Sequence, residues 1–139
     1  MSPLLISLQQ LSKQFYLYDQ TTSEKGVVDA VNSVDLDILS GETLGLVGES
    51  GCGKSTLGRC ILRLIEPTAG KIIYENQNLL KIPEKAFKPY RKKMQIVFQD
   101  PFASLNPRKS IQFILEEPLI IHGVSNPHDR KNRLDETIE

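Results

Sequence analysis

The sequence predicts an α/β fold in which a phosphate-binding loop connects a buried strand to a helix. Residues 48–56 read Gly-Glu-Ser-Gly-Cys-Gly-Lys-Ser-Thr and match the P-loop pattern G-x-x-x-x-G-K-[ST]. The apolar run 44–47 before this loop is typical of a central parallel strand. After the loop, apolar residues recur at helical spacing and predict an amphipathic helix that ends before Pro67. Its apolar face comprises Leu57, Cys60, Ile61, Leu64 and Ile65.

The residue types in the loop suit the phosphate groups of a nucleotide. Glycines let backbone N–H groups approach an anion closely, and the following helix directs the positive end of its dipole at the same anion. Lys54 brings a positive charge to the β- and γ-phosphates, and the Ser55 hydroxyl can bind Mg²⁺. The predicted phosphate-binding residues are Gly48, Ser50, Gly51, Cys52, Gly53, Lys54, Ser55 and Thr56.

The residues before the loop predict two antiparallel strands. Segment 4–9 alternates and predicts a first strand, and Val34, Leu36 and Ile38 share one face of a half-exposed strand over 31–38. The aromatic segment 15–18 fits either more core strand or a surface on which a nucleobase stacks, and residue types alone do not choose. Polar residues between these strands predict a surface loop.

After the predicted P-loop helix, short apolar runs predict strands at 71–74 and 95–98. The basic run within 83–93 is typical of a solvated helix face, although a phosphate-binding patch is the alternative. Ser110 can cap a helix that runs to about Glu117. The polar remainder of the chain shows a helical tendency after residue 127.

Composition indicates a soluble chain that is long enough for one core. The 139 residues carry 17 basic and 17 acidic side chains, so net charge gives no argument for nucleic acid as a partner. No apolar run approaches the length of a membrane span, and the first residues lack a signal-peptide pattern. Cys52 and Cys60 do not form a disulfide framework and predict reduced thiols. His122 and His128 lack a metal-binding pattern.

The P-loop and the run 95–108 together resemble the nucleotide-binding domain of ABC transporters. The run reads Gln-Ile-Val-Phe-Gln-Asp-Pro-Phe-Ala-Ser-Leu-Asn-Pro-Arg, and it is similar to the Q-loop region of the oligopeptide and dipeptide importer ATPases. The resemblance implies ATP and Mg²⁺ as ligands, with Phe15 stacking on adenine. It also implies that Gln99 senses Mg²⁺ and the γ-phosphate, so Ser55 and Gln99 are the expected metal-site residues and Lys54 and Gln99 assist catalysis.

The resemblance divides the chain into two parts. Residues 1–98 would form the P-loop core with an antiparallel β subdomain, and residues 99–139 would form the Q-loop and the beginning of a helical subdomain. Three family motifs do not occur in the sequence: the LSGGQ-type signature, the apolar strand that ends in Asp-Glu, and the switch histidine. The chain therefore resembles a truncated front part of such an ATPase, and we expect it to bind ATP without efficient hydrolysis.

The resemblance also implies partners and a location. Family members work with membrane permease subunits, with a second ATPase subunit and indirectly with a substrate-binding protein, at the cytoplasmic side of the membrane. The leading interpretation is the ATP-binding subunit of an importer of oligopeptides or dipeptides, with nickel and other small solutes as the alternative substrates. The alternatives are a non-catalytic remnant that binds nucleotide or a partner, and a different P-loop enzyme such as a small-molecule kinase.

Overall fold

The computed structural model describes residues 2–18, 25–100 and 105–138. The chain forms two compact units, Met1–Met94 and Gln95–Glu139, which are described separately below. The first unit contains strands β1 (Leu4–Tyr18), β2 (Lys25–Leu39), β3 (Ala69–Tyr74) and β4 (Gln77–Asn78). Its helices are α1 (Lys54–Ile61) and α2 (Lys88–Lys93), with 3₁₀ turns η1 (Leu79–Lys81) and η2 (Glu84–Ala86). The second unit contains α4 (Ile111–Ile121) and α5 (Pro127–Ile138).

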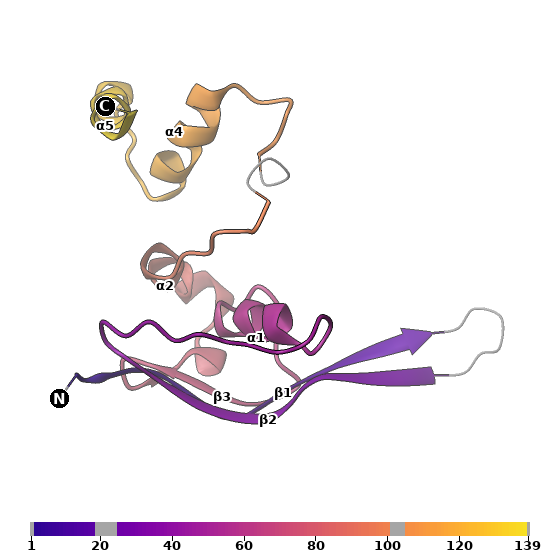
Figure 1. Ribbon diagram of the computed structural model, residues 1–139. Helices are drawn as coiled ribbons and strands as arrows, with labels where there is room; N and C mark the ends of the chain where they lie inside the picture. The colour runs from indigo at the N-terminus through magenta and orange to yellow at the C-terminus, as the bar shows by residue number, and fades with distance from the viewer. Residues whose placement is uncertain (1, 19–24, 101–104, 139) are drawn as a thin grey trace. The chain divides into compact units, whose positions relative to one another are not determined.

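The first unit is built on an antiparallel sheet in the order β2-β1-β3-β4, with α1 on one face (Figure 1). The strands predicted at 4–9, 31–38 and 71–74 are confirmed, and each observed strand is longer than its prediction. Val34, Leu36 and Ile38 are half-buried while Asp35 and Asp37 are exposed, as the alternation predicts. The aromatic segment 15–18 continues β1, where Phe15 pairs with Val28 of β2.

A bulge in β1 changes which residues face the core. Gln10 has a φ of +48°, and the pairing of β1 with β2 shifts between Leu8 and Leu11. The Gln10 N–H donates to Asp35 Oδ1 at 2.8 Å, so the side chain of β2 satisfies the backbone group that the bulge releases. As a result Leu8 and Leu11 are both buried although three positions separate them.

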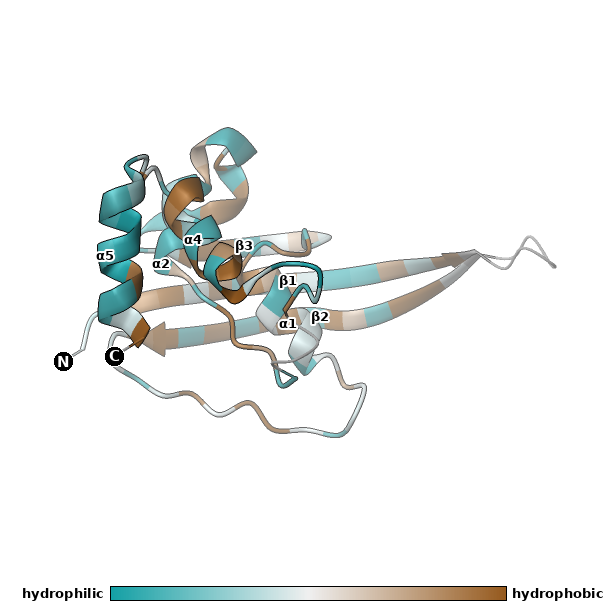
Figure 2. Ribbon diagram, turned by 90° about the horizontal axis from the view of Figure 1, so that it is seen from above, coloured by the Kyte–Doolittle hydropathy of each residue, from teal (hydrophilic) through white to brown (hydrophobic). Residues whose placement is uncertain are grey.

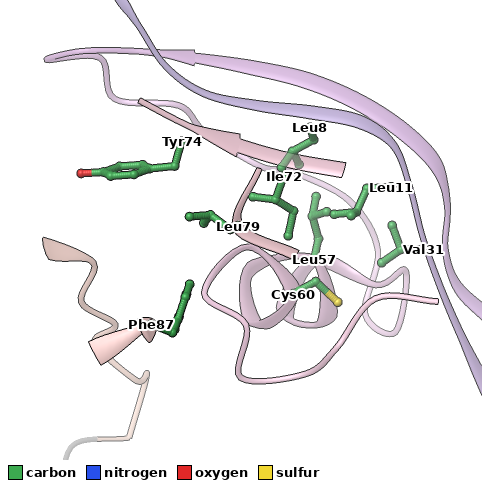
Figure 3. Packing of buried hydrophobic residues seen from close by; sticks show 9 residues of the cluster. All are labelled: Leu8, Leu11, Val31, Leu57, Cys60, Ile72, Tyr74, Leu79 and Phe87. Atoms are coloured by element: carbon green, nitrogen blue, oxygen red, sulfur yellow. The ribbon is translucent and has the colours of Figure 1, made fainter. Parts of the chain in front are cut away.

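The core lies between the sheet and α1. Leu57 and Cys60 of α1 pack with Leu8, Leu11 and Ile72 of the sheet (Figure 3). Burial raises the pKa of the Cys60 thiol. The remaining buried members of this cluster are Val31, Tyr74, Leu79 and Phe87.

Helix α1 ends at Ile61, which is earlier than the sequence predicts. The predicted helix continues to Ile65, but Arg63 adopts a left-handed backbone with a φ of +50°. The Arg63 guanidinium donates to Leu79 O at 2.8 Å and to Ile82 O at 2.9 Å, and it stacks over the Phe87 ring at 4.6 Å. These tertiary contacts outweigh the helical tendency of the segment.

The strands predicted at 44–47 and 95–98 are not observed, and both predictions are wrong for this structure. Segment 44–47 runs as an extended loop apart from the sheet, and Val47 is 95% exposed (Figure 2). Val97 in the second unit is likewise 94% exposed. An apolar run becomes a strand only when a neighbouring strand accepts and donates its backbone hydrogen bonds, and no described residues pair with either segment.

In the second unit, α4 and α5 pack together around Leu134, which is buried. The Ser110 hydroxyl accepts a hydrogen bond from the Phe113 N–H at 3.2 Å, so the predicted cap is confirmed, and α4 runs four residues beyond Glu117 to Ile121. Arg130 of α5 joins the helices, because its guanidinium lies 3.8 Å from Glu116 and donates to Ser125 O at 2.8 Å. Among the residues described, no helix is both long enough and apolar enough to cross a bilayer.

Candidate functional site

The candidate site is the loop 48–53 and the first turn of α1. Lys54, the first residue of α1, folds its side chain back across this loop. Its ammonium donates to Gly48 O at 2.7 Å and to Glu49 O at 2.6 Å. An ammonium has three donors, so two of them brace the loop and the third can reach a bound anion. The Cys52 sulfur, at 3.3 Å, is a weak partner that an anionic oxygen would outcompete.

Two glycines give the loop its course. Gly51 and Gly53 have φ values of +84° and +94°, a region that side chains with a Cβ rarely adopt. Gly53 also touches β2, since a Cβ placed on it would lie 2.0 Å from the carbonyl oxygen of Ala30. The loop is therefore seated against the sheet at a position where only glycine fits.

The first turn of α1 provides backbone donors directly after the loop. Lys54, Ser55 and Thr56 carry the first N–H groups of the helix, for which an α-helix contains no acceptors. Gly53 is the N-cap residue and has no side chain that could accept these bonds. A helix start with backbone donors and an adjacent ammonium is chemically suited to a polyanion such as a nucleoside triphosphate.

Phe15 lies near this loop through the pairing of β1 with β2. Phe15 is opposite Val28, which is two residues from the Ala30 carbonyl that touches Gly53. Two residues of a strand span about 7 Å, so the backbone position paired with Phe15 is close along β2 to the residue that contacts Gly53. Phe15 is 37% exposed, while Tyr16 is 57% exposed, so both aromatic side chains are accessible.

A lysine that the sequence reasoning missed touches Phe15. The Lys13 ammonium lies 5.1 Å from the centre of the Phe15 ring and donates to Glu66 O at 2.8 Å. Spacing could have revealed it, because residues two apart on a strand share a face. Ala30 was also missed, and its contact with Gly53 depends on tertiary structure that the sequence does not show.

Two further bonds join the same segments. The Thr68 N–H donates to Ser12 O at 2.8 Å, and the Gln14 N–H donates to Thr68 Oγ1 at 3.0 Å. With the bond from Lys13 to Glu66, these contacts form a clasp between residues 12–14 of β1 and residues 66–68 beyond α1. The chain after the P-loop helix is thereby tied to β1 beside Phe15.

The two predicted metal-site residues lie in different units. Ser55 is exposed in the first turn of α1, where its hydroxyl is available to a cation beside a phosphate. Gln99 belongs to the second unit and is exposed at a bend. Its meeting with the P-loop therefore stays a prediction. Residues 102–108, the second half of the run that resembles the Q-loop region, lie partly outside the described residues.

Comparisons with known proteins agree on one family. The sequence model of the family described as ABC transporter matches residues 31–139. The chain is 43% identical to the oligopeptide transport ATP-binding protein AppF of Bacillus subtilis over 136 residues, which cover 96% of this chain and 41% of AppF. It is 41% identical to the oligopeptide transport ATP-binding protein OppF of the same organism, with 100% of this chain and 44% of OppF covered.

A solved structure is similar to the whole fold. The ATP-binding cassette MJ0796, in a dimeric post-hydrolysis state bound to ADP and Pi, matches with a TM-score of 0.74 and 25% sequence identity. The match covers 95% of this chain and 55% of that one. The chain thus spans about two fifths of the length of the oligopeptide relatives and has the fold of part of an ATP-binding cassette.

Proposed function

Because this chain belongs to the ABC transporter family, we propose that it is an ATP-binding segment of an importer subunit for oligopeptides. One observation carries the proposal: the Lys54 ammonium is braced on two loop carbonyls at the start of α1, and its third donor meets the weak Cys52 sulfur acceptor, which a phosphate would displace. The named relatives AppF and OppF support the choice of oligopeptides. The choice of ATP rests on the P-loop and on the nucleotide bound to MJ0796.

The loop would hold the phosphates of ATP. In this proposal, Lys54 contacts the β- and γ-phosphates, and the N–H groups from Gly51 to Thr56 surround the same oxygens. Gly48 and Ser50 complete the loop, and the Cys52 side chain borders the site. A Cβ at Gly53 would collide with β2, so the loop lies directly against the sheet at this residue.

The metal site would form beside these phosphates. Mg²⁺ prefers oxygen ligands and retains several waters, so a single hydroxyl such as that of Ser55 fits the P-loop side of the site. When bound, Mg²⁺ neutralises phosphate charge. The amide oxygen of Gln99 is the proposed second protein ligand.

The base would stack on Phe15. The ring is accessible, and Phe15 pairs with Val28, which lies two residues along β2 from the Ala30 contact with Gly53. Stacking between the base and an aromatic ring would add about 0.5–1.5 kcal/mol to the binding free energy. Tyr16 follows Phe15 on the strand and is expected to point to the opposite face of the sheet.

The 139 residues are proposed to bind ATP without turning it over. Lys54, Ser55 and Gln99 would hold ATP and Mg²⁺, but an ammonium, a hydroxyl and an amide are not general bases that would activate water. A positioned general base contributes typically about 10²–10⁴-fold to rate. In the family that base follows a second apolar strand, a pattern that does not occur in this sequence.

The proposed partners are a membrane permease and a second ATP-binding subunit. The MJ0796 cassette is dimeric, which supports the second partner for this chain. Segment 102–108 is the proposed permease contact, and the subunit would lie at the cytoplasmic side of the membrane. A substrate-binding protein would meet the complex indirectly through the permease.

Calorimetry with ATP and Mg²⁺ tests the proposal. Lys54→Ala should weaken binding about tenfold or more, because a hydrogen bond to a charged group contributes about 1.5–3 kcal/mol. Lys71→Ala is the matched control, since Lys71 is an exposed lysine of β3 next to the buried Ile72 and points away from α1. Equal affinity in the Lys54 and Lys71 variants would refute the proposed site. Steady phosphate release above that of Lys54→Ala would refute the absence of turnover.

A further inference from the structure

Lys13 connects the proposed base contact to the segment that follows the P-loop helix. Its ammonium lies 5.1 Å from the centre of the Phe15 ring and donates to Glu66 O at 2.8 Å. We infer that Lys13 is a positioning residue for adenine. The Lys13 ammonium covers one face of the Phe15 ring and leaves the other face open to the base. The inference rests on the proposed function, in which Phe15 stacks on adenine.

The geometry around Phe15 explains why such a residue is needed. Phe15 lies 37% exposed in a two-stranded part of the sheet, because the pairing of β1 with β3 ends at Ser12. A ring that could change rotamer would lose that freedom when a base binds, which adds to the cost of binding. A cation held against one face restricts the ring before the base arrives.

The ammonium itself is held by the clasp. Lys13 lies between Ser12 and Gln14, whose backbone groups bond to the N–H and the hydroxyl of Thr68. The backbone carbonyl of Glu66 is therefore fixed relative to β1. Because Lys13 donates to this carbonyl, its side chain is more restrained than that of a free surface lysine. The Lys13 side chain contacts both the ring and the Glu66 carbonyl. The competing explanation is that Lys13 contacts a phosphate directly, and the experiment must exclude it.

The experiment compares ATP with inorganic tripolyphosphate, which lacks a base. Lys13→Met keeps the length of the side chain and removes the charge. It should raise the Kd for ATP about two- to fivefold and leave the Kd for tripolyphosphate unchanged. Lys13→Arg, which retains a cation and a donor, should restore most of the affinity for ATP. Far-UV circular dichroism and urea unfolding verify that each variant is folded.

A double-mutant cycle with Phe15→Leu decides whether Lys13 acts through the ring. If the inference is right, Lys13→Met has no effect on ATP binding in the Phe15→Leu background. Equal losses for ATP and tripolyphosphate would overturn the inference, because they would place Lys13 at the phosphates. The same loss in both backgrounds would also overturn it, since the ring would not mediate the effect.

The failure of the proposed function would look different. If Phe15→Leu binds ATP as tightly as the parent chain, the stacking of adenine on Phe15 is wrong and the inference falls with it. If Phe15→Leu weakens ATP binding but Lys13→Met does not, the stacking stands and only the role of Lys13 is refuted. Lys54→Ala in the same titrations reports on the phosphate site independently of both.

Discussion

Replacing Gly53 by alanine should damage the P-loop more than any other single methyl group added there. Gly53 has a φ of +94°, and its new Cβ would lie 2.0 Å from Ala30 O of β2. The left-handed backbone costs a residue with a Cβ about 1–2 kcal/mol. The collision adds about 1–3 kcal/mol of overpacking, since either the loop or β2 has to move. Together these terms predict that Gly53→Ala lowers the free energy of unfolding by about 2–5 kcal/mol.

Two neighbouring glycines provide matched controls. Gly51 also has a positive φ, of +84°, but a Cβ there would meet nothing within 4 Å. Gly51→Ala therefore bears only the backbone term of about 1–2 kcal/mol. Gly58 lies inside α1 without a positive φ and has open space around it, so Gly58→Ala should stabilise the protein by about 0.5–1 kcal/mol.

Urea unfolding gives the free energy of unfolding of all three variants. It is monitored by far-UV circular dichroism, because the chain has no tryptophan that could serve as a fluorescence probe. Titration with ATP gives the functional readout. Displacing the N–H groups beside Gly53 should weaken binding about tenfold or more, because bonds to charged oxygens are lost. If Gly53→Ala and Gly51→Ala differ by less than about 0.5 kcal/mol in stability, the seating of the loop against Ala30 is wrong.

Two further predictions concern the rest of the first unit. Arg63→Met should lower the free energy of unfolding by about 2–4 kcal/mol, because it leaves two partly buried carbonyls without their charged donor. Glu66→Gln, which removes only the exposed partner of Arg63, should cost less than about 1 kcal/mol in the same urea unfolding, and equal losses would contradict the role of the carbonyls. The hydrogen bond from Lys93 lowers the pKa of Glu75 below its ordinary 4.5. The stabilising contribution of this pair is therefore fully present above pH 4.5, and it is lost as the pH falls through the lowered pKa. An NMR titration should show the Glu75 pKa rise in Lys93→Met, and an unchanged value would rule out Lys93 as the cause.

Sequence reasoning succeeded where the signal is local. The P-loop pattern identified a loop in which Lys54 donates a hydrogen bond to the carbonyl of Gly48. This contact depends only on two residues that are six positions apart in the sequence. The Ser110 cap and the alternation of Val34, Leu36 and Ile38 were likewise confirmed, because each reports on near neighbours along the chain.

It failed where the outcome depends on a distant partner. Segments 44–47 and 95–98 have the composition of buried strands, but composition does not supply the neighbour that a strand must bond to. The early end of α1 follows from carbonyls at Leu79 and Ile82 that capture Arg63. The bulge at Gln10 requires Asp35 of β2. The periodicity of apolar residues reports only on a local window of sequence, so it could not predict any of these distant partners.

In the candidate site, the antiparallel sheet holds the segments at both ends of helix α1. At the start of α1, Gly53 is seated on the Ala30 carbonyl. Beyond its end, residues 66–68 are clasped to residues 12–14. Since Phe15 and Val28 are paired in the same two strands, hydrogen-bonded backbone sets the separation between the phosphate loop and the ring. Under the proposed function, a ligand whose phosphates and base match that separation would bind without ordering a flexible segment, and this would lower the entropic cost of association.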